Sequence, residues 1–305
     1  MTAVAPAQRD KRITELADPE SGHEQPRVAG AKRRSPGQFA LHILLIAMAT
    51  LTLIPVILVI STTLKTPAEV RTDPFSLFTS FSLENIVTAW TLGRFSDYLV
   101  DSILLTVPST ALVVIFSTMA GYTFARLPFR GRTVLFYLVV LGLLVPFFTF
   151  MIPLYFQLRG MGLLDTLPGA ILVLASTGTS FGTFFMRAFF SELPPELEQS
   201  ARVDGASEWQ IFVRVMLPLV GSGAGALTVF TFLGNWNNFL IPLLYLPSGE
   251  FRPLTAGLYN FTSGRSLDIG PLAAGTLITI IPVIVLFIVL QRQVTQGFIS
   301  GAVKG

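Results

Sequence analysis

Residues 39–64 read FALHILLIAMATLTLIPVILVISTTL, and this stretch contains no Asp, Glu, Lys or Arg. About 20 consecutive, mostly apolar residues are enough for one helix to cross the hydrocarbon core of a bilayer. The basic cluster Lys32–Arg33–Arg34 stands shortly before it. The stretch therefore predicts a transmembrane helix with a positively charged flank.

Five more stretches farther along the chain have the same character, at roughly residues 98–124, 134–156, 168–190, 219–246 and 272–290. Over all 305 residues, 51% are hydrophobic and only 13% are charged, whereas soluble domains average about 25% charged residues. A buried soluble core could account for one or two such runs but not for six. We therefore expect an all-α polytopic membrane protein with six transmembrane helices.

The basic residues set the expected orientation, since cytoplasmic loops carry an excess of Lys and Arg. With a cytoplasmic N-terminus, 15 of the 21 Lys and Arg residues fall on the inside. Six spans then place both termini in the cytoplasm. Residues 1–37 are polar and lack the apolar core of a signal peptide. We expect residues 1–37 to form a disordered cytoplasmic tail and residues 38–305 to form the transmembrane domain.

Several function classes are disfavoured by the composition. The net charge is +3, but the basic residues follow membrane sides rather than one patch interleaved with aromatics, so no nucleic-acid partner is expected. The chain has no Cys and two His, and it contains no Gly-rich loop ending in Gly-Lys-Ser/Thr that would hold ATP phosphates. We predict no metal, no cofactor and no catalytic residue, and we expect any energy for transport to come from another chain.

One inside segment, residues 191–218, reads SELPPELEQSARVDGASEWQIFVRVMLP. Pro194 and Pro195 suit a helix start, Asp204–Gly205 predicts a turn, and Ser207 with Gln210 has the spacing of a capping box. An apolar face is expected for the second helix, formed by Trp209, Phe212, Val213 and Met216. This helix–turn–helix is either an amphipathic connector on the lipid headgroups or a docking element for a cytoplasmic partner.

The segment resembles the EAA motif of ABC importer permeases, which is Glu-Ala-Ala, three residues, Gly, nine residues, Ile, one residue and Leu-Pro. Here the spacing is filled by Gln199, Ser200, Ala201, Gly205, Val215, Leu217 and Pro218. The chain departs from the motif at Gln199, Ser200 and Val215, which replace Glu, Ala and Ile. Further segments are similar to the carbohydrate-uptake branch and to the second permease of maltose-type importers: residues 121–126, 152–155, 162–165, 236–239 and 301–305.

The resemblance implies the fold of a type I ABC importer transmembrane domain in the bacterial plasma (inner) membrane. It implies a non-catalytic permease subunit that forms half of a sugar pathway. The expected partners are two copies of an ATP-binding subunit, a second permease, an extracytoplasmic solute-binding protein, the sugar and membrane lipid. The ATPase-coupling loop would be residues 191–218. Its expected coupling residues, which would contact the ATPase or shape the loop, are Gln199, Ser200, Ala201, Asp204, Gly205, Ala206, Trp209, Phe212, Leu217 and Pro218.

A second candidate site lies within the fifth predicted span, where Asn235, Trp236, Asn237 and Asn238 form its densest polar and aromatic cluster. Amides suit sugar hydroxyls and an indole ring suits the apolar face of a sugar, so a substrate pathway is one hypothesis. Hydrogen bonding between helices is the other. For the whole chain, two alternatives also stay open: an importer permease for a non-sugar solute, and an independent channel or secondary carrier.

Overall fold

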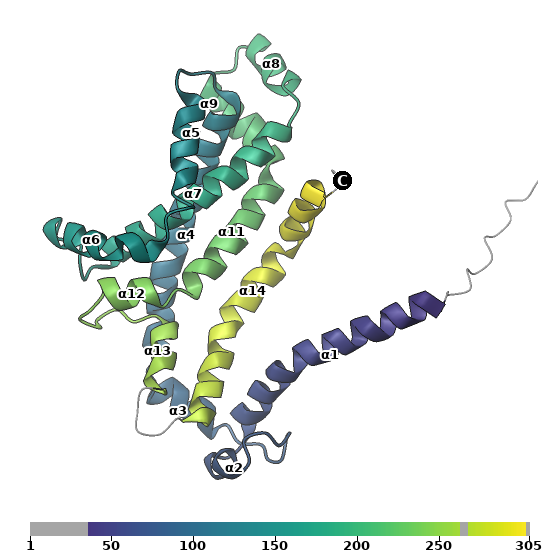
Figure 1. The fold of residues 1–305 in the computed structure, drawn as a ribbon, viewed down its shortest axis with the longest axis vertical. Helices are drawn as coiled ribbons and strands as arrows, with labels where there is room; N and C mark the ends of the chain where they lie inside the picture. The colour runs from purple at the N-terminus through teal and green to yellow at the C-terminus, as the bar shows by residue number, and fades with distance from the viewer. Residues whose placement is uncertain (1–35, 263–267, 303–305) are drawn as a thin grey trace, which may run out of the picture. The chain divides into compact units, whose positions relative to one another are not determined.

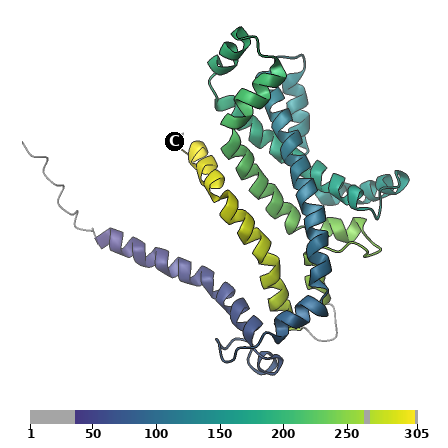
Figure 2. The same ribbon diagram turned by 180° about the vertical axis from the view of Figure 1, so that it is seen from behind.

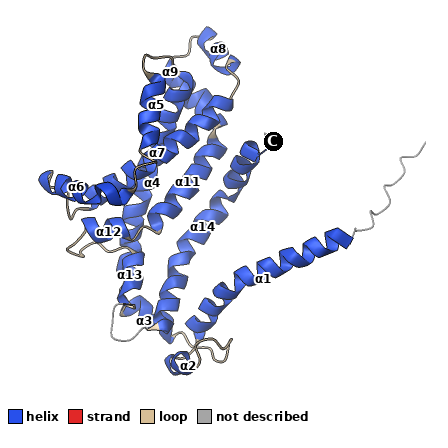
Figure 3. Ribbon diagram, in the orientation of Figure 1, coloured by secondary structure: helices blue, strands red, loops and turns tan. Residues whose placement is uncertain are grey.

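The computed structural model describes residues 36–262 and 268–302, and within these ranges every regular element is a helix (Figure 3). The predicted tail, residues 1–37, lies outside the described residues except for its last two, which begin the first helix. In chain order the helices are α1 (Pro36–Leu64), α2 (Pro67–Thr72), α3 (Glu84–Thr91), α4 (Phe95–Arg126), α5 (Arg132–Leu141), α6 (Phe147–Gly160), α7 (Leu167–Glu192), α8 (Glu196–Val203), α9 (Glu208–Gln210), η1 (Ile211–Met216), α10 (Leu217–Leu219), α11 (Gly221–Trp236), α12 (Leu240–Tyr245), α13 (Leu254–Asn260) and α14 (Ile269–Ala302).

The chain divides into two units within α1, between Ile54 and Pro55. The described part of the first unit is residues 36–54 of α1. Its side chains from residue 37 onward are exposed, although most of them are apolar. A helix that is apolar all round is stable in lipid or inside a protein but not in water. This part of α1 is therefore suited to a membrane.

The second unit is organised around four long helices, α4, α7, α11 and α14, which lie side by side in both views (Figures 1 and 2). The helices α4 and α7 pack closely at Gly121. A Cβ atom there would lie 2.7 Å from the Cβ of Met186 and 2.9 Å from the main-chain nitrogen of Arg187. Small residues permit this close helix packing in membranes, so Gly121 fixes how α4 meets α7.

Four of the six predicted spans are continuous helices long and apolar enough to cross a bilayer. Two of them are the whole helices α4 and α7. The other two are residues 37–64 of α1 and residues 269–292 of α14. By the same criteria, a fifth span results if α11 is joined to the preceding helix Glu208–Leu219, from which it is bent by 75°. The remaining predicted span, residues 134–156, is divided into the shorter helices α5 and α6.

Proline explains the division of the third predicted span. Pro146 precedes α6 with an extended backbone (φ −61°, ψ 135°), and the residue before a proline also avoids helical geometry. The break therefore falls in residues 142–146. The fifth predicted span, residues 219–246, is divided too: α11 ends at Trp236 and the short helix α12 begins at Leu240. Each of these two predicted spans therefore consists of two helices rather than one.

Candidate functional site

The segment predicted as a helix–turn–helix forms one end of the second unit, opposite the end that carries α3 (Figure 1). Its first helix, α8, closes with two hydrogen bonds: Ala206 N donates to Ala201 O at 3.0 Å, and Gly205 N donates to Arg202 O at 3.1 Å. This pair of bonds is a Schellman motif, which places a left-handed residue directly after the helix C-cap. Gly205 occupies that position with φ +81°, so the predicted turn is confirmed.

The second part of the loop starts with the predicted capping box. Ser207 N donates to Gln210 Oε1 at 2.8 Å, and Gln210 N donates to Ser207 Oγ at 3.3 Å. The following residues form a π-helix, Ile211–Met216, and Leu217 N bonds to Phe212 O five residues back. Pro218 favours this wider turn, because a proline has no N–H and its ring presses on the carbonyl four residues earlier.

The buried face of this helix differs from the prediction. Phe212 and Met216 are buried as expected, together with Ile211, whereas Trp209 is 62% exposed and Val213 is also exposed. Ile211 and Met216 are the two ends of the π-helix and both are buried, whereas Trp209 precedes it in α9. Phe212 packs on Tyr122 of α4, with ring centroids 5.0 Å apart.

The motif positions divide into exposed and packed residues. Ala201, Ala206 and Leu217 are partly buried against the core that contains Tyr122, Met186, Phe190, Ile211, Phe212 and Met216. The exposed positions are Gln199, Ser200, Asp204, Gly205, Trp209 and Pro218. The loop is thus anchored by its buried residues, and it exposes polar groups and the indole ring of Trp209, which lies beside Phe212 with ring centroids 5.5 Å apart.

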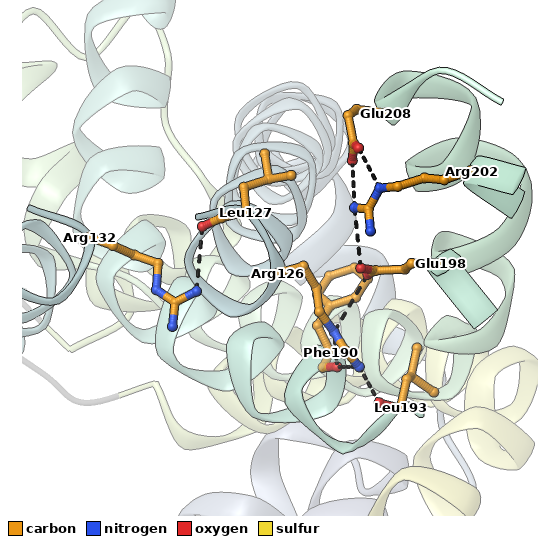
Figure 4. Close-up of polar contacts among 8 residues, drawn as sticks. All are labelled: Arg126, Leu127, Arg132, Phe190, Leu193, Glu198, Arg202 and Glu208. Atoms are coloured by element: carbon orange, nitrogen blue, oxygen red, sulfur yellow. Dashed lines mark hydrogen bonds and ion pairs between the residues drawn. The ribbon is translucent and has the colours of Figure 1, made fainter. Parts of the chain in front are cut away.

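The prediction missed a chain of charged residues that attaches the loop to α4 (Figure 4). The carboxylate of Glu198 on α8 is buried, and it lies 3.6 Å from Arg126 Nε and 3.6 Å from Arg202 Nη2. Arg202 also pairs with Glu208, with Nε 2.7 Å from Oε1. The Arg202 guanidinium donates hydrogen bonds to both carboxylate oxygens of Glu208. These two bonds lower the pKa of the Glu208 carboxyl below its ordinary value.

Arg126 extends this chain to the end of α7. Its guanidinium donates to the main-chain oxygen of Phe190 from Nε at 2.9 Å and from Nη2 at 2.6 Å, and it also donates to the main-chain oxygen of Leu193. The last carbonyls of a helix have no partner within the helix, and Arg126 supplies one. The charges of Arg126 and Glu198 were visible in the sequence, but their burial depends on how α4 meets α8.

The second candidate cluster divides between packing and exposed positions. Asn235 is buried, and its Nδ2 donates to Ser109 Oγ at 3.0 Å and to Thr110 Oγ1 at 3.4 Å on α4. Trp236 is buried as well, and its Nε1 donates to Thr279 O on α14 at 3.1 Å. These two residues join helices, as the second hypothesis expected.

The other two members of the cluster follow the end of α11. Asn238 Oδ1 accepts a hydrogen bond from Ile241 N at 2.9 Å at the start of α12. The side chain of Asn237 is exposed and donates to Leu233 O at 2.9 Å. Of the four residues, Asn237 is therefore the one whose side chain faces outward.

Comparison with known proteins agrees with this architecture. The model of the family described as "Binding-protein-dependent transport system inner membrane component" matches residues 113–298. The chain belongs to this family. The match covers α7, the loop with its Schellman turn and capping box, and α11.

Relatives of this permease support the assignment along most of its length. It is 34% identical over 282 residues to the diacetylchitobiose uptake system permease protein NgcG of Streptomyces coelicolor, covering 91% of this chain and 93% of the relative. It is 31% identical over 255 residues to the trehalose transport system permease protein SugB of Mycobacterium tuberculosis, covering 83% and 93%. The permease is accordingly a multi-pass protein of the plasma membrane.

The fold resembles a solved structure. A chain of a bacterial ABC transporter involved in the import of the acidic polysaccharide alginate superposes with a TM-score of 0.76 at 24% identity, covering 86% of this chain and 98% of that chain. At this identity the likeness establishes the fold alone. The permease therefore has the ABC importer permease fold, with four to five apolar helices that can cross a membrane.

Proposed function

We propose that this permease forms half of the translocation pathway of an ATP-driven importer for a sugar or oligosaccharide. Its relatives include uptake permeases for diacetylchitobiose and trehalose and for arabinooligosaccharides. The observation that carries the proposal is the loop at residues 191–218, in which Phe212 and Met216 are buried in the core while Gln199, Ser200 and Trp209 are exposed. A solvent-facing helix–turn–helix built into the membrane helices suits a docking element.

In this proposal a separate chain hydrolyses ATP, and two copies of it act on this permease and on a second permease. The coupling surface comprises the motif residues, with Gly205 as the fixed turn and Trp209 as the exposed apolar contact. Gln199 offers an amide where the family motif has a carboxylate, so it contributes a neutral hydrogen bond to the ATPase. A solute-binding protein delivers the sugar on the opposite side of the membrane.

The proposal includes six spans with both termini in the cytoplasm, residues 1–37 as a cytoplasmic tail and residues 38–305 as the permease domain. A helix rises 1.5 Å per residue, and α5 has 10 residues, so α5 alone is shorter than the hydrocarbon core of ~30 Å. The third span then needs α5 and α6 together. Because the chain has no native Cys, labelling of single-cysteine variants from each side of the membrane tests this topology.

Asn237 is the proposed sugar contact in this half of the pathway. Its exposed amide sits where α11 ends, and an amide can both donate to and accept from sugar hydroxyls. Asn235 and Trp236 support it by joining α11 to α4 and α14. Asn238 fixes the turn that leads into α12.

The experiment that tests the function is purification of the tagged permease in mild detergent, mass spectrometry of the accompanying chains, and reconstitution of the complex into liposomes. We expect an ATP-binding subunit and a second permease to copurify. We also expect ATP-dependent uptake of at least one member of a panel of diacetylchitobiose, trehalose and arabinooligosaccharides. Uptake of peptides or amino acids instead would contradict the sugar assignment, and transport by the purified chain alone would favour a channel or secondary carrier.

A further inference from the structure

The helix α8 is attached to the rest of the permease in an unusual way. Glu198 is its only buried residue, while Leu197 and Val203 are exposed and Ala201 is only partly buried. Apolar burial normally holds a short amphipathic helix in place. Here the side chain that enters the interior is a carboxylate, so the position of α8 depends on what surrounds that charge.

The surroundings of Glu198 are charged on two sides. Arg126 Nε and Arg202 Nη2 each lie 3.6 Å from one of its oxygens, and among the described residues its Oε1 has no hydrogen-bond partner. The carboxylate is therefore held by electrostatic attraction rather than by directional hydrogen bonds at that oxygen. Removing one member of a buried ion pair is costly because the other charge is left uncompensated.

Arg126 is held much more firmly than Glu198. Its side chain is 10% exposed, and its guanidinium makes hydrogen bonds to the main-chain oxygens of Phe190 and Leu193 (Figure 4). One side chain thus joins the end of α4, the end of α7 and the helix α8. The attraction between Glu198 and this fixed guanidinium varies smoothly with distance, so α8 can shift slightly and still pull on both helices.

We propose that Arg126 and Glu198 are positioning residues for coupling, which transmit movement of the loop to the ends of α4 and α7. The inference rests on the proposed function, because it assumes that a separate ATPase moves the loop. It assigns Glu198 to the interior of this permease rather than to the surface that the ATPase contacts. Gln199, the neighbouring residue, remains on that surface.

The test uses the complete complex with its ATPase, partner permease and binding protein in liposomes. The variants are Glu198→Gln, which keeps the size and removes the charge, Glu198→Ala, and Arg126→Lys, which keeps the charge and removes the planar fork. Matched controls are Glu196→Gln on the exposed side of α8 and Arg130→Lys beyond the end of α4, both exposed. The readouts are the amount of complex, basal ATP hydrolysis, sugar-stimulated ATP hydrolysis, and sugar uptake per ATP hydrolysed.

We expect both controls to stay within about twofold of the parent complex in every readout. In Glu198→Ala and Arg126→Lys, uptake per ATP hydrolysed should fall by about tenfold while basal hydrolysis is retained, and Glu198→Gln should lie between. A Glu198→Gln complex with normal uptake per ATP would overturn the proposal. So would loss of assembly in all three variants, because the pair would then serve folding alone. Absence of any ATPase from the parent complex would instead contradict the proposed function.

Discussion

Near the C-terminal end of α4, Arg126 faces the Glu198 carboxylate at 3.6 Å, whereas near the middle of the same helix Ser109 and Thr110 face the neutral amide of Asn235. Both contacts are buried and both attach α4 to another part of the chain. A full charge is costly at the centre of a bilayer, so neutral groups serve there. At the loop end of α4 the apolar stretch ends, so burying a charge pair there costs less free energy than at the bilayer centre. The buried charge pair thus lies at the loop end of α4, whereas the neutral contact lies within its apolar stretch.

Replacing Arg126 with Met should give the largest effect on stability. Loss of its charge leaves Glu198 buried beside Arg202 alone, and the expected cost is about 3 kcal/mol. Thermal unfolding in detergent measures it, with Arg130→Met as the matched control at an exposed arginine. If the two variants unfold at the same temperature, the buried pair of Arg126 and Glu198 does not stabilise the protein, which would contradict this prediction.

Gly205→Ala should have the next largest effect. The Cβ meets no atom within 4 Å, so the cost comes from the backbone at φ +81°. Placing a non-glycine residue in this region costs about 1 kcal/mol, and the strained turn should also reduce uptake per ATP. Gly221→Ala is the control, because its added Cβ also meets nothing within 4 Å and no positive φ is present. Equal uptake and unfolding in both variants would show that the Schellman turn is not required.

Asn235→Leu should cost less than either change at the loop. The variant loses two hydrogen bonds to α4, and hydrogen bonds between membrane helices contribute about 0.6 kcal/mol on average. Ser109 Oγ keeps its bond to Leu105 O at 2.7 Å, so this hydroxyl stays hydrogen-bonded in the variant. A cost in thermal unfolding as large as that of Arg126→Met would reverse the comparison between the two regions.

The smallest expected change in stability is that of Asn237→Ala, because the side chain is exposed. Surface substitutions usually lie within about 0.5 kcal/mol. The sugar concentration for half-maximal uptake should nevertheless rise several-fold, while Gly234→Ala, at an exposed position within α11, should leave it unchanged. An unaltered uptake curve for Asn237→Ala would remove this residue from the proposed pathway.

Much of the loop could be predicted from local sequence. Gly205 after Asp204 and the Ser207–Gln210 spacing each encode a feature within a few residues, and both are confirmed. The π-helix was not predictable from the apolar pattern, since Trp209 and Phe212 fit one face of an α-helix equally well. Only packing against Tyr122 of α4 decides which of them is buried.

For the membrane helices, too, features encoded by neighbouring residues could be predicted, whereas contacts between distant parts of the sequence could not. Hydropathy located α4 and α7, because each is a long apolar run without a break. It could not detect the break before Pro146, since average hydropathy is insensitive to one backbone conformation. The burial of Glu198 depends on Arg126, 72 positions earlier in the sequence, and no local pattern encodes that contact.

The central claim, that the loop receives a separate ATPase, is tested most directly by site-specific crosslinking. A photocrosslinker on a single cysteine at Val203, which is 88% exposed beside the Schellman turn, is compared with one at Leu92, which is 80% exposed after α3 at the opposite end of the second unit. We predict that illumination of the assembled complex links the ATP-binding subunit to position 203 and not to position 92. A link at position 92, or none at position 203 in a complex that transports sugar, would contradict the account.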